Sequence, residues 1–358
     1  MRTDPITTLG EAIGFFEETY KAHPERDAHE ALVSARAGRP RRYPIVTLNH
    51  LGDPADTTEA VDEIALPEVR TADSPEGNLA RELMSRLNPL KMLNPIAPCI
   101  RLGKGPGSLV PCFGIPLNPE AFDSPAYTVS IDEALDRFPD DVAASGILPE
   151  THERIDFIRS VTPDLVKIEV PDLQGPFNLA HAIVGEHAML GPYTEPDKFK
   201  ELMRRMTDFW IAARTQLVDW IGPDRLWPAH HNRICECSVN LVSADFYMEH
   251  IFPEERRAAE ALGKVHIHPC SGPHVFKATL ERLPNVVSHE AGHIEKTAAG
   301  CIEVDEALEL IGERPIALGI GQEVEPGNEY EFVRRDLERY LDTPRLTFSY
   351  TGMHWRKK

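Results

Sequence analysis

The chain has 358 residues, 42% of them hydrophobic, with a formal net charge of −19 and a sequence pI of about 5.2. Such an acidic surface repels phosphate backbones and anionic membranes, so we expect neither nucleic acid nor a membrane as a partner. The 6 cysteines lack the spacing of a disulfide framework, and no apolar stretch reaches the roughly 18 residues of a membrane span. We therefore expect a cytoplasmic protein without an export signal.

The first part of the chain predicts an N-terminal helical extension, residues 1–37, ahead of one large domain, residues 38–358. Apolar residues recur at helical spacing over 9–37, interrupted by Pro24. A basic turn then leads into a strand that ends near Leu48. An acidic loop and a helix over 79–87 follow, and the Pro- and Gly-rich stretch 95–125 predicts short strands with long loops.

From residue 164 onward, predicted strands and helices alternate. The predicted strands cover 164–170, 234–242, 265–268, 285–288, 315–320 and 346–350. The predicted helices cover 177–190, 195–221, 256–262, 275–283, 304–311 and 329–341. This alternation predicts a parallel sheet with helical crossovers, and the number of units favours a (β/α)8 barrel of the TIM type over an open sheet.

Polar residues follow the predicted strands, where a barrel of this kind carries its chemistry. We expect this mouth to hold Asp172, Gln174, Asn240, Ser243, His268, Cys270, His289, Glu290, Gln322, Glu323 and residues 351–354. Within that group, we assign substrate binding to Asp172, Gln174, Asn240 and Gln322. Glu290, which follows the predicted strand over 285–288, and His268 are catalytic candidates.

The most distinctive stretch is the strand over 265–268 and the loop that follows Pro269. His268 and Cys270 leave this strand end together, so that an imidazole and a thiolate reach one point. Zinc and similar metals prefer these donors. The alternative from the residues alone is a buried histidine and a buried free thiol packed at the end of a strand.

Several segments resemble the uroporphyrinogen decarboxylase superfamily over roughly residues 30–354. They are the run from Asp172 to Gly185, the segment Ser243–Pro253, His268-Pro-Cys270, and the segments 303–312 and 319–326. The resemblance implies a (β/α)8 barrel that is often a homodimer. The superfamily contains cofactor-free porphyrinogen decarboxylases, and zinc-dependent methyltransferases that move a methyl group between a corrinoid and a thiol.

The methyltransferase branch joins a His-x-Cys pair to a cysteine at the end of the last strand. His268 and Cys270 match the pair, whereas Met353 stands where the late cysteine is expected, beside His354. The resemblance therefore implies zinc at His268, Cys270 and His354, with Glu290 as a further candidate ligand. Zinc there would present a thiol as a thiolate for methyl transfer, with a corrinoid as methyl donor or acceptor and a corrinoid protein as an expected partner.

The first alternative is a cofactor-free decarboxylase of a carboxylated tetrapyrrole, such as uroporphyrinogen, or of a smaller acid. Arg41 and Arg42, with Arg101 and Lys104, would bind carboxylates. His181 or His268 would donate the proton that replaces the carboxyl group. The second alternative is a corrinoid- or tetrapyrrole-binding protein without turnover.

Two further patterns have simpler interpretations. His289-Glu-Ala-Gly-His293 fits the zincin motif, but the motif needs a helix and here it follows a predicted strand, so we interpret it as a chance match. Cys235 and Cys237 alternate on a predicted strand and would point to one side. They are interpreted as small residues that fill the barrel interior, with a second ligand pair or a redox pair as alternatives.

Overall fold

The computed structural model describes most of the chain. The described residues are 4–23, 45–48, 66–88, 97–103, 105, 107–118, 120, 124–227, 232–268, 273–283, 285–290, 302–323, 329–343 and 345–351. No helix in these ranges is both long and apolar enough to cross a membrane.

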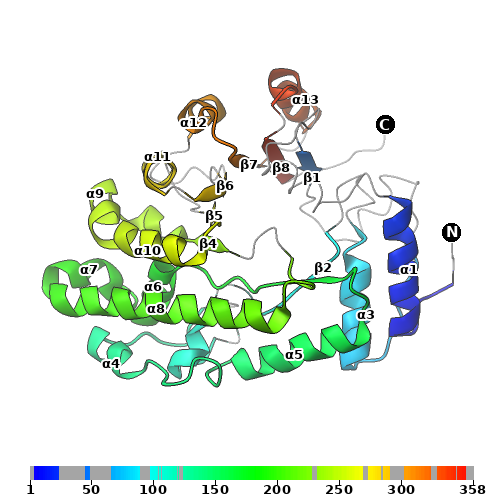
Figure 1. Ribbon diagram of the computed structural model, residues 1–358, viewed down its shortest axis with the longest axis horizontal. Coiled ribbons are helices and arrows are strands. Elements are labelled where there is room, and N and C mark those ends of the chain that lie inside the picture. The colour runs from blue at the N-terminus through cyan, green and yellow to red at the C-terminus, as the bar shows by residue number, and fades with distance from the viewer. Residues whose placement is uncertain are drawn as a thin grey trace.

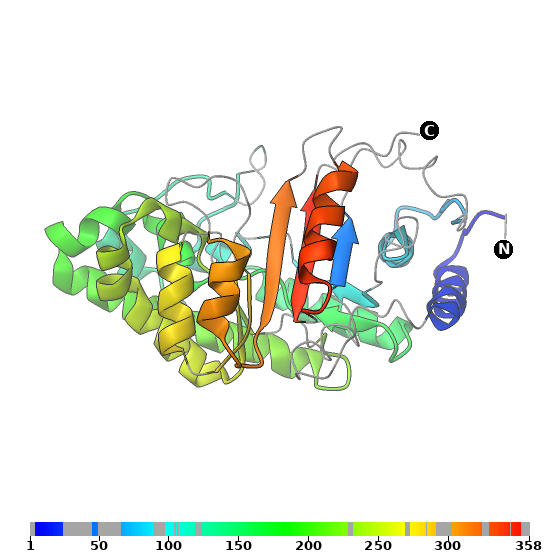
Figure 2. The same ribbon diagram turned by 90° about the horizontal axis from the view of Figure 1, so that it is seen from above.

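All strand pairs in the described residues are parallel. The strands are β1 (Ile45–Leu48), β2 (Cys99–Arg101), β3 (Lys167–Glu169), β4 (Arg233–Cys235), β5 (Val265–His268), β6 (Val286–Glu290), β7 (Ala317–Glu323) and β8 (Leu346–Thr351). One six-stranded sheet has the order β1-β8-β7-β6-β5-β4, and β2 pairs with β3 in a second sheet. Figure 2 shows β7, β8 and β1 side by side and pointing the same way.

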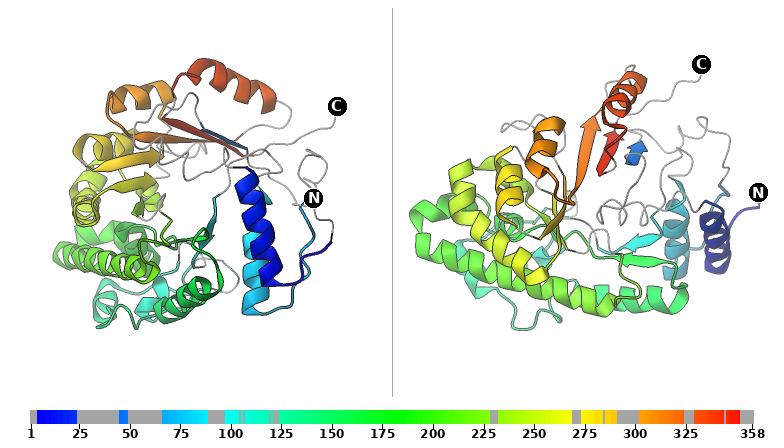
Figure 3. Two further views of the ribbon diagram at one scale, coloured as in Figure 1. Left: turned by 45° about the vertical axis from the view of Figure 1, so that its right-hand side comes forward. Right: turned by 45° about the horizontal axis from the view of Figure 1, so that its top comes forward.

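Helices follow most of the strands and lie on the outer side of the sheets (Figures 1 and 3). The α-helices are α1 (Leu9–Ala22), α3 (Pro75–Ser85), α4 (Ile131–Asp136), α5 (Leu148–Val161), α6 (Pro176–Val184), α7 (His187–Thr194), α8 (Pro196–Ile221), α9 (Ala244–Phe246), α10 (Phe252–Leu262), α11 (Pro273–Arg282), α12 (Val304–Ile311) and α13 (Glu329–Tyr340). The short helices η4 (Val110–Phe113) and η5 (Cys237–Leu241) are 3-10 helices, and η6 (Tyr247–Ile251) is a π-helix.

A short bridge connects the two sheets through the segment that precedes β4. Leu226 forms an isolated parallel bridge with Ile168 of β3. The Ile168 N–H donates to the Arg225 carbonyl at 2.7 Å, and the Trp227 N–H donates to the Ile168 carbonyl at 2.8 Å. The predicted parallel α/β architecture is confirmed, but closure is not, since no ladder joins β1 to β2 within the described residues.

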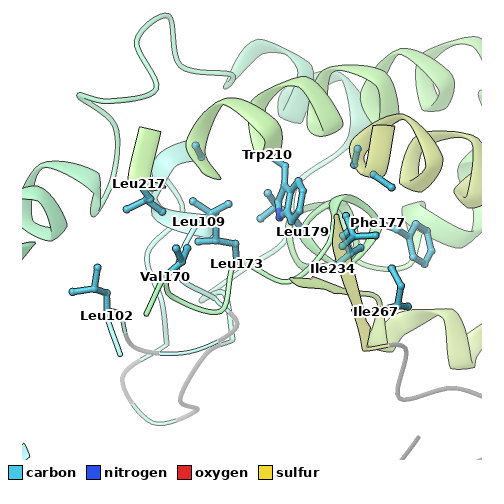
Figure 4. Packing of buried hydrophobic residues seen from close by; sticks show 14 of the residues in the cluster. Leu102, Leu109, Val170, Leu173, Phe177, Leu179, Trp210, Leu217, Ile234 and Ile267 are labelled. Carbon is cyan, nitrogen blue, oxygen red and sulfur yellow. The ribbon is translucent and has the colours of Figure 1, made fainter. Parts of the chain in front are cut away.

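The long helix α8 covers the strands with one apolar face. Its 26 residues begin with Pro196, which suits the first helical turn, and the helix ends before Gly222, whose φ of +74° is left-handed. Trp210 and Leu217 point from α8 toward the strands (Figure 4) and are fully buried. The helix predicted over 195–221 is therefore confirmed, and its packing fixes the β3 side of the site.

Two predicted elements are shorter than the sequence suggests. The helix predicted over 177–190 breaks at Gly185, whose φ of +58° is unfavourable for other residues and which lies against Thr128. The strand predicted over 234–242 ends at Cys235, and η5 takes its place. The prediction that Cys235 and Cys237 share a strand is therefore wrong. In the helix predicted over 9–37, α1 ends at Ala22 and residues 24–37 lie outside the described ranges.

The carboxylate of Glu236 explains why the chain leaves the strand after Cys235. This buried side chain accepts hydrogen bonds from the N–H groups of Phe177, at 3.0 Å, and Asn178, at 2.8 Å. Both groups belong to the first turn of α6, where a carboxylate satisfies unpaired donors. A side chain at Gly175 would overlap the Glu236 carboxylate. Glu236 thus ties the end of β4 to the start of α6.

A second buried carboxylate, Glu255 of α10, makes folding stability depend on pH. Burial raises the pKa of Glu255 from 4.5 to about 7, although the hydrogen bond from the Tyr247 hydroxyl lowers it. Because the folded state binds the Glu255 proton more tightly than the unfolded chain does, the protonated carboxyl stabilises the folded state. This contribution is fully present below pH 4.5 and is lost as the pH rises through about 7. The shift corresponds to roughly 3 kcal/mol.

Glu255→Gln is therefore expected to remove most of this loss of stability between about pH 5 and about pH 8. Glutamine stays neutral and can still accept the Tyr247 hydrogen bond. Urea unfolding at both pH values measures the effect, with the exposed Glu249→Gln on the neighbouring η6 as the control. An equal fall in stability in wild type and Glu255→Gln would contradict the assignment.

Candidate functional site

Three neighbouring strands bring their inward-facing side chains into one cluster. Cα pairing places Arg233 of β4 beside His266 of β5, and His266 beside Ser288 of β6. Alternate residues of a strand share a face, so His268 and Glu290 lie on the same side as these residues. Their partners on the other face include Ile234 and Ile267, which are buried against the helices (Figure 4).

Glu290 is the centre of this cluster because each of its oxygens meets a histidine. Its Oε1 lies 2.9 Å from His266 Nε2, and its Oε2 forms a short hydrogen bond with His268 Nδ1. His266 also forms a short hydrogen bond with Ser288 through Nδ1. Both nitrogens of His266 are thus engaged within the protein, and Glu290 holds the His268 ring through Nδ1.

The shared carboxylate changes the protonation of the cluster. Burial lowers the pKa of His268, but hydrogen bonds with Cys237 and Glu290 outweigh it, and the pKa rises to about 9. Burial raises the pKa of Glu290, but the hydrogen bonds from His266 and His268 hold it well below the usual range. Near neutral pH the cluster therefore contains a carboxylate and an imidazolium, and any metal that binds His268 must displace a proton.

Two arginines extend the charged cluster toward β2 and β3. Arg233 Nη2 lies 3.7 Å from Glu290 Oε1, and Arg233 Nη1 lies 3.9 Å from Asp172 Oδ2. Arg101, the last residue of β2, approaches the same Asp172 oxygen at 3.5 Å. Because these ion pairs connect side chains of both sheets, the two sheets face a common interior. Burial lowers the pKa of Arg233, but the neighbouring groups Cys235, Glu290 and Asp172 raise it by more, so the guanidinium stays charged.

The turn after β3 holds Asp172 and Gln174 in a fixed arrangement. Asp172 Oδ1 accepts hydrogen bonds from the Gln174 backbone N–H and from Nε2, both at 3.1 Å. Trp210 Nε1 donates to the Gln174 carbonyl at 2.9 Å. Gln174 adopts a φ of +58°, a left-handed conformation that non-glycine residues rarely adopt. These hydrogen bonds offset that strain, which is a feature of functional turns.

His181, the predicted proton donor, lies on α6 and not beside Glu290. Its Nδ1 lies 2.8 Å from the Ser238 hydroxyl at the start of η5. The Ser238 backbone N–H donates to Asn178 Oδ1 at 2.7 Å, so α6 and η5 are joined at this point. Burial lowers the pKa of His181, so it is neutral at pH 7 and better suited to accept a proton than to donate one.

Asn240, expected at a strand end, lies within η5 instead. Gln322 lies on β7, where its Cα pairs with that of Tyr350 of β8, and its side chain is outside the described part of the chain. Arg41, Arg42, Lys104, Cys270 and His354 also fall outside the described ranges. Of the predicted site residues, the structure thus brings His268 and Glu290 into contact and places Asp172 and Gln174 on the same charged network.

The described residues include no group of three or more histidine, cysteine, aspartate or glutamate side chains arranged to hold a metal. Within these ranges, the histidine and cysteine that meet are His268 and Cys237, whose side chains share a hydrogen bond. The set His268, Cys270 and His354 therefore stays a prediction, since two of its members are not described.

Of the zincin-like motif His289-Glu-Ala-Gly-His293, the structure describes His289 and Glu290, and His289 packs in the core. His289 is fully buried on the helix side of β6, with Nε2 2.7 Å from the Thr279 hydroxyl and Nδ1 2.8 Å from the Glu290 carbonyl. Its ring packs on Phe276 of α11, with the ring centroids 4.3 Å apart. Burial lowers the pKa of His289 to about 4. His289 and Glu290 point to opposite faces, so they do not form a protease site.

Sequence reasoning missed Arg233, His266 and the role of Cys237. The alternation of His266 with His268 on one strand was a signal that both would face inward. Arg233 stands at the start of β4, one residue ahead of the predicted strand, and was left out for that reason. The contact of Cys237 with His268 depends on η5, which a strand prediction excluded.

Comparison with known proteins supports the fold. No protein-family model matches the chain, and no curated protein matches it. The structure is similar to that of a methyltransferase from Methanosarcina mazei, with 16% sequence identity, a TM-score of 0.59, and coverage of 90% of this chain and 92% of the other. The glycoside hydrolase domain of PelA from Pseudomonas aeruginosa aligns at 11% identity over 86% of this chain and 94% of the other. Its TM-score of 0.29 is too low to indicate a shared fold.

Proposed function

We propose that this chain is a metal-assisted methyltransferase whose strands form a (β/α)8 barrel with the site at the carboxyl ends of the strands. The observation that carries the proposal is the His268 ring, held through Nδ1 by the Glu290 carboxylate. Metal-binding histidines usually donate their second ring N–H to a carboxylate in this way. The fold shared with a methyltransferase supports the same conclusion.

The residues that the structure describes fit zinc in their chemistry. His268 offers Nε2, and the Cys237 sulfur lies in hydrogen-bond contact with this histidine. Nitrogen and sulfur donors suit zinc. We propose that His268 and Cys270 hold the metal, with His354 as the third ligand. Glu290 accepts hydrogen bonds from two histidines, so we assign it to positioning His268 and not to binding metal.

The chain's own residues would perform the other tasks. Bound zinc would lower the pKa of an acceptor thiol and present it as a thiolate. Glu290 orients His268, and the hydrogen bonds from His266 and His268 keep Glu290 ionised. Asp172, Gln174 and Asn240 are proposed to bind substrate, together with Gln322, Arg41 and Arg42. We further propose a corrinoid, carried by a partner protein, as the methyl source or acceptor. We also propose a homodimer, and a main domain that begins at residue 38.

Methyl transfer tests this proposal directly. Wild type, supplied with methylcobalamin, zinc and a set of small thiols, is expected to demethylate the corrinoid and to form a thioether. His268→Gln is expected to lose at least about a hundredfold in rate, as is typical when a catalytic metal ligand is removed. The exposed Glu281→Gln on α11 serves as the control. Equal rates in wild type and His268→Gln would contradict the proposal.

A cofactor-free decarboxylase is the second candidate, because two cations face the common interior. Arg101 and Arg233 both lie within 4 Å of Asp172 and offer positive charge for a substrate carboxylate. His268, protonated near neutral pH, would supply the replacing proton. Release of carbon dioxide from a carboxylated tetrapyrrole in the presence of a chelator would favour this candidate, and its absence would count against it. Binding of a corrinoid or tetrapyrrole without any product would indicate a binding protein.

A further inference from the structure

A cavity of about 280 Å³ opens at the carboxyl end of β2, between α3 and the start of α5. Arg101, the last residue of β2, and Gly103 line it from the strand side. Glu82 of α3 and Glu150 in the first turn of α5 line it from the two helices, which meet beside β2 (Figure 1). Pockets for drug-sized ligands begin at roughly 300 Å³, so this cavity suits a small metabolite.

The cavity adjoins the turn that carries Asp172. Gly103 has a φ of +81°, and a Cβ at this position would lie 2.6 Å from Pro171 Cβ, so both the conformation and the close approach require glycine. Pro171 directly precedes Asp172, and Arg101 Nη2 lies 3.5 Å from Asp172 Oδ2. Arg101 therefore borders both the cavity and the charged network around Glu290.

The charge of Glu82 is balanced within the protein. Its Oε2 lies 3.1 Å from Arg154 Nη2, and its Oε1 lies 3.3 Å from Arg86 Nη2. Arg154 also lines the cavity, and its pair with Glu82 joins α5 to α3. We therefore assign Glu82 and Arg154 to the wall of the cavity and not to the binding of a ligand.

Arg101 and Glu150 are the charges that remain for a ligand. The Arg101 side chain is 41% exposed, and its ion pair with Asp172 engages one nitrogen of a guanidinium that has five N–H donors. Glu150 is exposed and forms no ion pair with another residue of the described ranges. A cation and a carboxylate in one small cavity complement a ligand that carries both charges, whereas a ligand with one charge would face a like charge.

We propose that this cavity binds a small zwitterion, a ligand with one carboxylate and one ammonium group. Arg101 would bind the carboxylate, and Glu150 would bind the ammonium group. Leu102, Leu117 and Ile147 also line the cavity and would pack against an apolar part of the ligand. The inference goes beyond the proposed function, because this site needs neither a metal nor a corrinoid.

Isothermal titration calorimetry of the full-length protein tests the inference with matched probes. L-Norleucine carries both charges, hexanoate lacks the ammonium group, and pentylamine lacks the carboxylate, while all three keep the alkyl chain. Wild type is expected to bind about one L-norleucine per chain. Hexanoate and pentylamine should bind at least about tenfold more weakly, since each loses a hydrogen bond to a charged group. A wild type without saturable L-norleucine binding would overturn the inference.

Matched variants assign the two charges. Arg101→Gln and Glu150→Gln should each weaken L-norleucine binding about tenfold, whereas Glu153→Gln, an exposed position on α5 outside the cavity lining, should bind like wild type. His268→Gln should also bind like wild type, so the inference and the proposed function can fail separately. Unchanged L-norleucine affinity in Arg101→Gln, or equal affinities of wild type for L-norleucine and hexanoate, would overturn the inference. Circular dichroism confirms that each variant is folded.

Discussion

Replacing Glu290 with glutamine is expected to lower the pKa of His268 from about 9 toward its ordinary value of 6.5. Glu290 supplies a hydrogen bond and a negative charge that favour the imidazolium, and glutamine removes the charge. Burial, which disfavours the charged ring, and the hydrogen bond with Cys237, which favours it, both stay in place. The neutral fraction of His268 at physiological pH would therefore rise, although glutamine keeps nearly the shape of Glu290.

Proton NMR of the metal-free protein measures this effect. The histidine C2 proton of His268 is assigned by its absence from His268→Gln and is followed between about pH 5 and about pH 10. Glu281→Gln, an exposed position on α11, should leave the pKa unchanged. A pKa near 9 in Glu290→Gln would mean that Cys237 alone maintains the imidazolium, and Glu290 would lose its assigned role.

Trp210→Ala is expected to cost about 3–5 kcal/mol in the free energy of unfolding, the usual range for a large buried aromatic residue. Trp210 is fully buried in the face of α8 that packs on the strands (Figure 4). Its Nε1 also holds the Gln174 carbonyl at 2.9 Å. The substitution thus removes both core packing and support for the strained turn that carries Asp172.

Chemical unfolding of three variants separates these contributions. Trp210→Phe keeps most of the apolar area and loses the hydrogen bond, so it should cost about 1–3 kcal/mol, since the Gln174 carbonyl is left without that donor. Trp220→Ala, on the same helix but only partly buried, should cost less than Trp210→Ala. Equal losses for Trp210→Ala and Trp220→Ala would contradict the packing described for α8.

The period of the apolar residues was enough to predict much of the parallel fold. It located α8 because Leu202, Met206 and Phe209 recur on one face, and it located β5 because Val265 and Ile267 alternate with two histidines. Boundaries set by tertiary contacts were not predictable in this way. Glu236 ends β4 by binding the first turn of α6, a contact between positions 58 and 59 residues apart.

The candidate site was predictable in part for the same reason. His268 and Glu290 end predicted strands, so their proximity follows from a parallel sheet. That Glu290 is shared by two histidines depends on the strand register, and that Cys237 reaches His268 depends on η5. Neither is visible in the sequence. Closure of the barrel, the predicted domain boundary and the roles of Cys270 and His354 remain predictions.

The metal content of the untagged protein tests the central claim most directly. Elemental mass spectrometry of wild type is compared with that of Cys270→Ala and His268→Gln, each checked for folding by circular dichroism. We predict about one zinc per chain in wild type and its loss in both variants. A wild type without stoichiometric metal, or variants that keep it, would contradict the metal-assisted account and favour the decarboxylase.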